Sequence, residues 1–169
     1  MLELAYEFKG LVMVTAFNIL YSVAAVRRLL GLSSSAQVQI REFFKVIWVW
    51  IRGRRPTFIS KAVFKQHFAE WRKSQSKNLK VTERLDLANH YTVRNLHKDT
   101  AYVVEKRADG VFCTCDDLNN QLEFFGRGCC KHGYAVLKHL GFGSLREYLQ
   151  AQKVVPLRKA SEPAATYAA

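Results

Sequence analysis

The segment Val111-Phe-Cys-Thr-Cys115 is followed, after fourteen intervening residues, by Cys130-Lys-His132. Three thiolates and one imidazole are donors that a structural zinc ion accepts in a tetrahedral site. The first pair is expected at the end of a strand, where the backbone must bend after Cys113. The second pair is expected at a helix start, where free amides and the helix dipole stabilise thiolate charge. This spacing predicts one Zn²⁺ ion held by Cys113, Cys115, Cys130 and His132.

The residues around these pairs predict a hairpin followed by helices. The segments His90–Arg94 and Thr100–Glu105 are rich in β-formers, and Asp109-Gly110 favours a turn between the second of them and the first cysteine pair. Beyond a polar loop, His132–Leu140 is typical of a short helix that ends at Gly141. Ser144-Leu-Arg-Glu147 is a capping box, which predicts a last helix to about Lys153.

This part of the chain resembles the SWIM zinc finger. The resemblance lies in Cys113-Thr-Cys115 and in Cys130-Lys-His132, which is followed by Gly-Tyr-Ala-Val-Leu137. That family carries Cys-x-Cys, a variable gap and Cys-x-His on a ββα unit, and the resemblance covers about residues 88–142. It implies that the same four side chains bind zinc. SWIM modules occur in transposases, helicase-like ATPases, recombination accessory proteins and signalling kinases. The resemblance therefore implies binding to DNA or to proteins, without specifying which.

Cys129 is the fourth cysteine and lies directly before Cys130. It could replace Cys130 as a ligand, but the Cys-x-x-His spacing would then depart from the family pattern. The preferred interpretation is a packed thiol beside the metal site. All four cysteines fall within 18 residues, which favours a metal in a reducing compartment over a spread disulfide framework.

The chain upstream of residue 81 predicts helices. Residues 2–30 are expected to form one apolar helix, with no charge between Gly10 and Val26. That helix either packs on the protein or on a second copy, or it lies in a membrane at residues 10–26. A second helix is predicted over Gln37–Ile51, and a third after the cap Ser60, with a core-facing stripe of Phe64, Phe68 and Trp71.

These segments together predict an α+β fold: N-terminal helices, then a small ββα zinc unit and a C-terminal helix. The expected units are an apolar helix (1–32), a basic helical segment (36–80), a SWIM-like domain with its closing helix (81–153) and a disordered tail (154–169). The first nine residues lack a basic n-region, so no secretory signal is expected. We expect a cytoplasmic protein, with the finger on the cytoplasmic side if the chain is membrane-associated.

The formal net charge is +12, and residues 41–107 hold 16 basic and 6 acidic side chains. This excess favours an anionic partner. The first hypothesis is nucleic-acid binding, to DNA rather than RNA, through phosphate contacts that salt weakens. The second is a protein-interaction adaptor, with a dimer interface or a membrane contact formed by the apolar segments. No catalytic motif is present, so we do not expect an enzyme. The candidate nucleic-acid-binding residues are Arg52, Arg54, Arg55, Arg94, Lys98, Arg127, Lys131 and Lys138.

Overall fold

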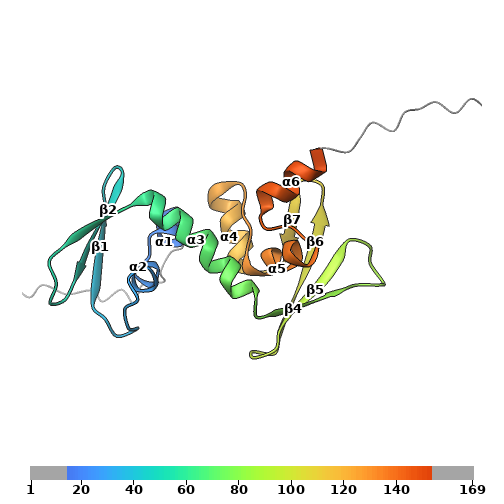
Figure 1. Ribbon diagram of the computed structural model, residues 1–169, viewed down its shortest axis with the longest axis horizontal. Coiled ribbons are helices and arrows are strands. Elements are labelled where there is room, and N and C mark those ends of the chain that lie inside the picture. Colours follow the sequence, from blue (N-terminus) through green and yellow to red (C-terminus); the bar gives the residue numbers. More distant parts are fainter. Residues whose placement is uncertain (1–14, 154–169) are drawn as a thin grey trace, which may run out of the picture.

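The computed structural model describes residues 15–153. Within this range the chain forms six helices and two antiparallel sheets, so the α+β class is confirmed. Figure 1 shows two lobes, one built on each sheet, with helix α3 (Lys61–Ser76) running from the first lobe to the second. No helix among residues 15–153 is long and apolar enough to span a membrane. The predicted tail and residues 2–14 of the predicted N-terminal helix lie outside the described residues.

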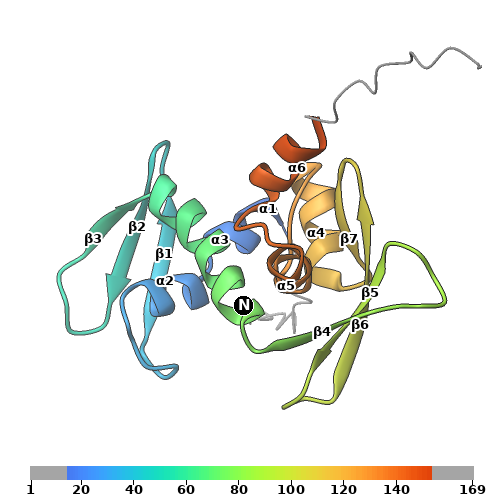
Figure 2. The same ribbon diagram turned by 45° about the vertical axis from the view of Figure 1, so that its right-hand side comes forward.

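The first lobe is a three-stranded sheet covered on one face by helices (Figure 2). Its strands β1 (Val38–Glu42), β2 (Val46–Ile51) and β3 (Thr57–Ser60) lie side by side in chain order. Alternate residues of β2 are buried, and they pack with residues of the covering helices. This core contains Ile47, Val49, Ile51, Tyr21, Ala25, Val26 and Phe64.

The prediction of a helix over Gln37–Ile51 is wrong. The segment forms β1 and β2, which pair antiparallel around a turn at Phe43–Lys45. Its second half, Val46-Ile-Trp-Val-Trp-Ile51, alternates half-buried and buried positions with the period of two that a strand requires. β-branched and aromatic side chains fit such a half-buried pleated surface, and they outweigh the helical interpretation here.

The single predicted helix over residues 2–30 is also wrong within the described range. Residues 16–29 form two short helices, α1 (Ala16–Leu20) and α2 (Val23–Leu29). Each begins at its own hydroxyl cap: Thr15 accepts a hydrogen bond from the Asn18 amide, and Ser22 accepts one from the Ala25 amide. Such caps favour a helix start over a helix interior, so Ser22 divides the segment.

Helix α3 begins at the predicted cap, since the Ser60 hydroxyl accepts a hydrogen bond from the Val63 amide. Of the predicted apolar stripe, Phe64 is fully buried in the first lobe. The C-terminal half of α3 contacts helix α5 (Lys131–His139) of the second lobe. The predicted boundary between residues 80 and 81 falls inside strand β4 (Leu79–Glu83), which follows the helix that both lobes share.

The second lobe is a four-stranded meander with three helices on its inner face. The strands follow in order: β4 (Leu79–Glu83), β5 (His90–Asn95), β6 (Thr100–Arg107) and β7 (Gly110–Cys113). The predicted hairpin between β6 and β7 is confirmed, but its turn lies at Ala108–Asp109, one residue before the predicted Asp109-Gly110, because Arg107 pairs with Gly110. Helices α4 (Asp116–Phe125), α5 and α6 (Leu145–Lys153) follow.

Candidate metal centre

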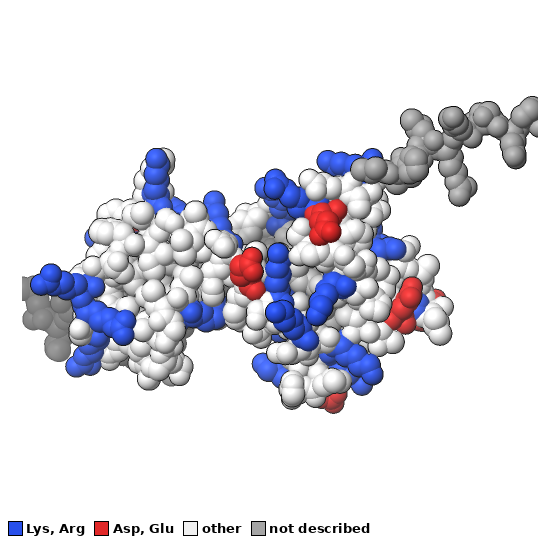
Figure 3. Space-filling view, in the orientation of Figure 1, with Lys and Arg blue, Asp and Glu red and all other residues white. Residues whose placement is uncertain are grey.

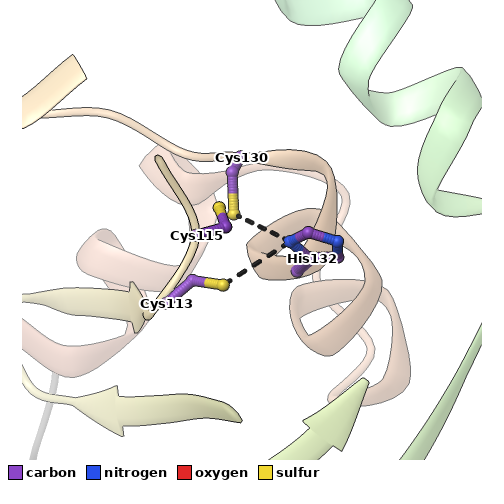
Figure 4. A group of neighbouring side chains, drawn as sticks. All are labelled: Cys113, Cys115, Cys130 and His132. Carbon is purple, nitrogen blue, oxygen red and sulfur yellow. Dashed lines mark hydrogen bonds between the residues drawn. The ribbon is translucent and has the colours of Figure 1, made fainter. Parts of the chain in front are cut away.

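Three elements of the second lobe bring the predicted metal ligands together. Strand β7 ends at Cys113, Cys115 lies at the N-terminus of α4, and Cys130 and His132 lie at the start of α5. The ligand atoms of these four residues all lie within 4.8 Å of one another, and all four side chains are buried (Figure 4). The sequence prediction that these side chains converge is confirmed.

The distances within the cluster match a tetrahedral zinc site. The Nδ1 atom of His132 lies 3.5 Å from the Cys113 Sγ atom and 3.8 Å from the Cys130 Sγ atom. Bonds of about 2.3 Å to sulfur and about 2.0 Å to nitrogen place these atoms about 3.5 Å apart in a tetrahedron. The imidazole presents Nδ1 to the thiols, and its ring stacks on Tyr102 with centroids 4.2 Å apart. The residues present therefore fit a metal ion with Cys₃His ligation.

The N-termini of two helices lie at the cluster. Cys115 is the N-cap of α4, where its sulfur accepts no cap hydrogen bond. Cys130 is the N-cap of α5, and its sulfur accepts a hydrogen bond from the Gly133 amide over 3.4 Å. The positive ends of both helix dipoles stabilise negative charge on sulfur. The N-termini of α4 and α5 thus favour the thiolate form of cysteine, which is the form that binds metals.

The pKa values of the three clustered thiols depend on one another. Side-chain hydrogen bonding with Cys113 and then with Cys130 holds the pKa of Cys115 far below its ordinary value. The same bond to Cys115 raises the pKa of Cys113 to about 12, and bonds to Cys113 and Cys115 raise that of Cys130. Without a cation, one thiolate therefore suppresses the ionisation of the other two. A bound divalent ion supplies the charge that lets all three ionise.

Cys129 is not part of the four-residue cluster. Burial raises the pKa of its thiol, and the sulfur faces the backbone carbonyl of Cys130 at 3.7 Å. A Cβ atom added at Gly133 would lie 2.9 Å from that sulfur, so the start of α5 packs tightly against it. Cys129 is therefore a packed, neutral thiol beside the cluster, as the sequence predicted.

A buried glutamine fixes the backbone just before Cys130. The side chain of Gln121 accepts a hydrogen bond from the Cys129 amide at 3.1 Å and donates one to the Asp117 carbonyl at 3.1 Å. A Cβ atom at Gly128 would lie 2.5 Å from the Gln121 side chain, so this approach requires glycine. Gln121 thus positions the Cys129–Cys130 segment.

The helix that carries this glutamine was not predicted. Residues 116–125 were expected to lie in a polar loop, yet they form α4. Two signals could have revealed it: Asp116 and Asp117 in the first turn, which suit a helix N-terminus, and Gly126 directly after the last turn. Gly126 has φ 66°, the left-handed conformation that ends many helices.

The candidate nucleic-acid-binding residues lie in three separate places. Arg52, Arg54 and Arg55 are exposed around the loop between β2 and β3. Arg94 and Lys98 are exposed on β5 and on the turn after it. Around the metal cluster, Arg127 and Lys138 are exposed, whereas Lys131 is half-buried. The structure therefore does not join these residues into one patch.

Figure 3 shows lysine and arginine side chains over both lobes, with few acidic side chains on the visible face. On that face the acidic groups lie over the middle of the molecule and the second lobe, and the first lobe shows basic groups alone. Comparison of the chain with protein-family models, with curated proteins and with solved structures gave no match.

Proposed function

We propose that this protein is a zinc-stabilised, non-enzymatic module that binds nucleic acid, DNA in preference to RNA, through its basic surface. The observation that carries the zinc part is the buried convergence of Cys113, Cys115, Cys130 and His132. Zinc is the ion of choice because thiolate-rich tetrahedral sites in proteins are typical of zinc. The ligand order and the strand-to-helix setting support a SWIM-type finger.

A structural role for the metal follows from the closed set of donors. Catalytic zinc sites keep one coordination position for water or substrate, whereas four protein ligands fill a tetrahedron. The four side chains are buried, with Cys130 fully enclosed and His132 4% exposed. The cluster also lies in the core of the second lobe, with Val104, Val111 and Val136. The bound ion would therefore stabilise this lobe rather than act on a substrate.

Nucleic-acid binding is supported by charge and its distribution. The net charge of +12 gives a long-range attraction to polyanions. Among residues 15–60, seven side chains are basic and one, Glu42, is acidic. Glu42 forms an ion pair with Lys61, which neutralises it. Among the described residues, no ion pair joins the other arginines and lysines of residues 15–60 to a carboxylate, so these side chains suit phosphate contacts.

Binding measured over a range of salt concentrations tests this function. A labelled DNA duplex, a DNA single strand and an RNA of the same length would be titrated with the full chain. Phosphate contacts release counterions, so the affinity should fall steeply and log-linearly as salt rises. Binding to none of the three at low salt would reject the nucleic-acid function and leave the metal site untouched.

The alternative is a protein-interaction adaptor, favoured by exposed apolar side chains on the second lobe. Leu85 is fully exposed and Leu87 is 44% exposed, both on the loop between β4 and β5. Such side chains commonly mark contact sites when they gather on one surface. Salt separates the two functions, because apolar docking tolerates salt and phosphate binding does not.

A further inference from the structure

The outer face of the first sheet carries aromatic side chains in neighbouring positions. Because Ile47, Val49 and Ile51 face the core, Trp48 and Trp50 of β2 lie on the opposite face. Phe58 of β3 is directly opposite Trp48 across the strands. Phe43, just beyond β1, extends the row, and its ring packs edge-on against Phe58 with centroids 6.0 Å apart.

The exposure of these aromatic rings differs along the row. Trp48 and Trp50 are half-buried, whereas Phe58 is 60% exposed and Phe44, at the turn between β1 and β2, is 89% exposed. In Figures 1 and 2, α2 and α3 lie on one side of this sheet, and no described element covers its other side. A gathered set of exposed aromatic rings on a soluble surface marks a binding site.

Basic side chains surround the same rings. Arg41 pairs with Trp48 across the strands, and its guanidinium lies 5.9 Å from the centre of the Phe43 ring. The Lys45 ammonium lies 6.0 Å from the Phe44 ring. At the other end of β2, Arg52 is held by a hydrogen bond to Gln37, next to the exposed Arg54 and Arg55. This arrangement favours a ligand that is both aromatic and anionic.

We propose that this aromatic face, formed by Phe43, Phe44, Trp48, Trp50 and Phe58, binds single-stranded nucleic acid. The inference rests on the nucleic-acid function proposed above and assigns it a site and a class of ligand. Unpaired bases stack on the rings, while Arg41, Lys45 and the arginines after β2 contact the phosphates. A duplex hides its base faces inside the helix, so the face selects single strands.

The sheet geometry suits successive bases. Adjacent strands lie about 4.8 Å apart and alternate residues of one strand about 6.8 Å apart. The row from Trp50 through Trp48 to Phe58 therefore places aromatic side chains within the span of a few nucleotides.

The test is a titration of the full chain with labelled oligothymidine of about 12 nucleotides, and with a duplex of the same length. The single strand should bind at least about tenfold more tightly than the duplex. The double variant Phe44→Ala/Phe58→Ala should lose about tenfold or more in affinity for the single strand. Both side chains are exposed, so the variant should fold. Leu85→Ala/Leu96→Ala, equally exposed on the second lobe, is the matched control and should bind normally.

Tryptophan fluorescence gives a second readout. Trp71, the third tryptophan, lies on α3 under the Arg28 guanidinium, at 4.3 Å from the ring centre. In a Trp71→Phe background, emission from Trp48 and Trp50 should be quenched when oligothymidine or oligouridine stacks on them. Saturable binding without quenching would place the ligand elsewhere and overturn the inference.

The outcomes separate the two proposals. Binding to neither single strand nor duplex would reject the nucleic-acid function itself. Equal binding to both, unchanged in Phe44→Ala/Phe58→Ala, would keep that function and overturn the site proposed here. A dimer of the full chain that this variant dissociates, with oligonucleotide binding intact, would assign the face to a second copy and also overturn it.

Discussion

Arg72 of α3 donates two hydrogen bonds to the carboxylate of Asp117 in the first turn of α4, over 2.9 and 2.6 Å. The arginine side chain is 10% exposed, and its guanidinium also donates to the Phe68 carbonyl and lies over the Phe68 ring. Asp117 follows Cys115 by two residues, and its carbonyl accepts the hydrogen bond from Gln121. A continuous set of polar contacts therefore joins the shared helix to the segment before Cys130.

Replacing Arg72 with methionine should destabilise the protein by about 2 kcal/mol, because a paired, largely buried charge is lost and Asp117 loses two charged hydrogen bonds. Methionine keeps much of the apolar stem, so the loss reports the guanidinium. Urea unfolding followed by far-UV circular dichroism measures this free energy.

The control for that variant is Arg84→Met. Arg84 also pairs with a carboxylate, that of Asp86, but this pair is exposed to solvent. Exposed ion pairs contribute little, so we expect no measurable loss of stability. Equal losses in the Arg72 and Arg84 variants would show that the contact to Asp117 has no special role.

Single cysteine variants should separate the metal ligands from the packed thiol. Cys130→Ala and Cys115→Ser should lose the bound metal and unfold the second lobe, because a structural ion supplies folding free energy. Cys129→Ala should keep one metal ion per chain, since its sulfur lies outside the cluster. Metal content measured by elemental analysis checks this. Metal loss in Cys129→Ala, with retention in Cys130→Ala, would exchange the two assignments.

The metal cluster could be predicted from sequence because its signal is local. The spacing of Cys113, Cys115, Cys130 and His132, with Asp109-Gly110 before it, fixes a hairpin and a helix start without reference to the rest of the chain. The cap at Ser60 and the capping box at Ser144 are local signals as well, and both are present: Ser144 accepts a hydrogen bond from the Glu147 amide.

The elements that were missed depend on tertiary contacts. In Gln37–Ile51 every second residue of β2 is buried only because α2 and α3 cover one face of the sheet. In α4, Gln121 is a polar residue that becomes buried because the Cys129 amide and the Asp117 carbonyl satisfy its side chain. The polar composition of residues 116–125, considered without these contacts, favours a loop.

Gly128→Ala should destabilise the second lobe by about 2 kcal/mol, the range for overfilling a packed interior. The added methyl group would lie 2.5 Å from the Gln121 side chain and disturb its hydrogen bond to the Cys129 amide. Gly143→Ala is a suitable control, because its nearest neighbour is the flexible Glu147 carboxylate at 3.3 Å. Thermal unfolding of both variants measures the difference, and similar melting temperatures would contradict the role assigned to Gln121.

Reversing three charges after β2 should weaken nucleic-acid binding without removing the metal. Arg52→Glu/Arg54→Glu/Arg55→Glu places carboxylates where phosphates are expected to bind, so the affinity should fall and depend less on salt. A triple variant with the same net charge, Arg84→Glu/Arg146→Glu/Lys153→Glu, controls for long-range attraction. Fluorescence anisotropy checks both. Equal losses would mean that net charge alone drives binding.

Native mass spectrometry of the purified full chain, before and after treatment with a chelator, tests the metal site most directly. We expect one zinc ion per chain. The chelator should remove this ion and shift the chain to the higher charge states of a partly unfolded protein, because the ion supplies folding free energy to the second lobe. A chain that carries no metal, and that keeps its fold unchanged in the chelator, would contradict the assignment of Cys113, Cys115, Cys130 and His132 as zinc ligands.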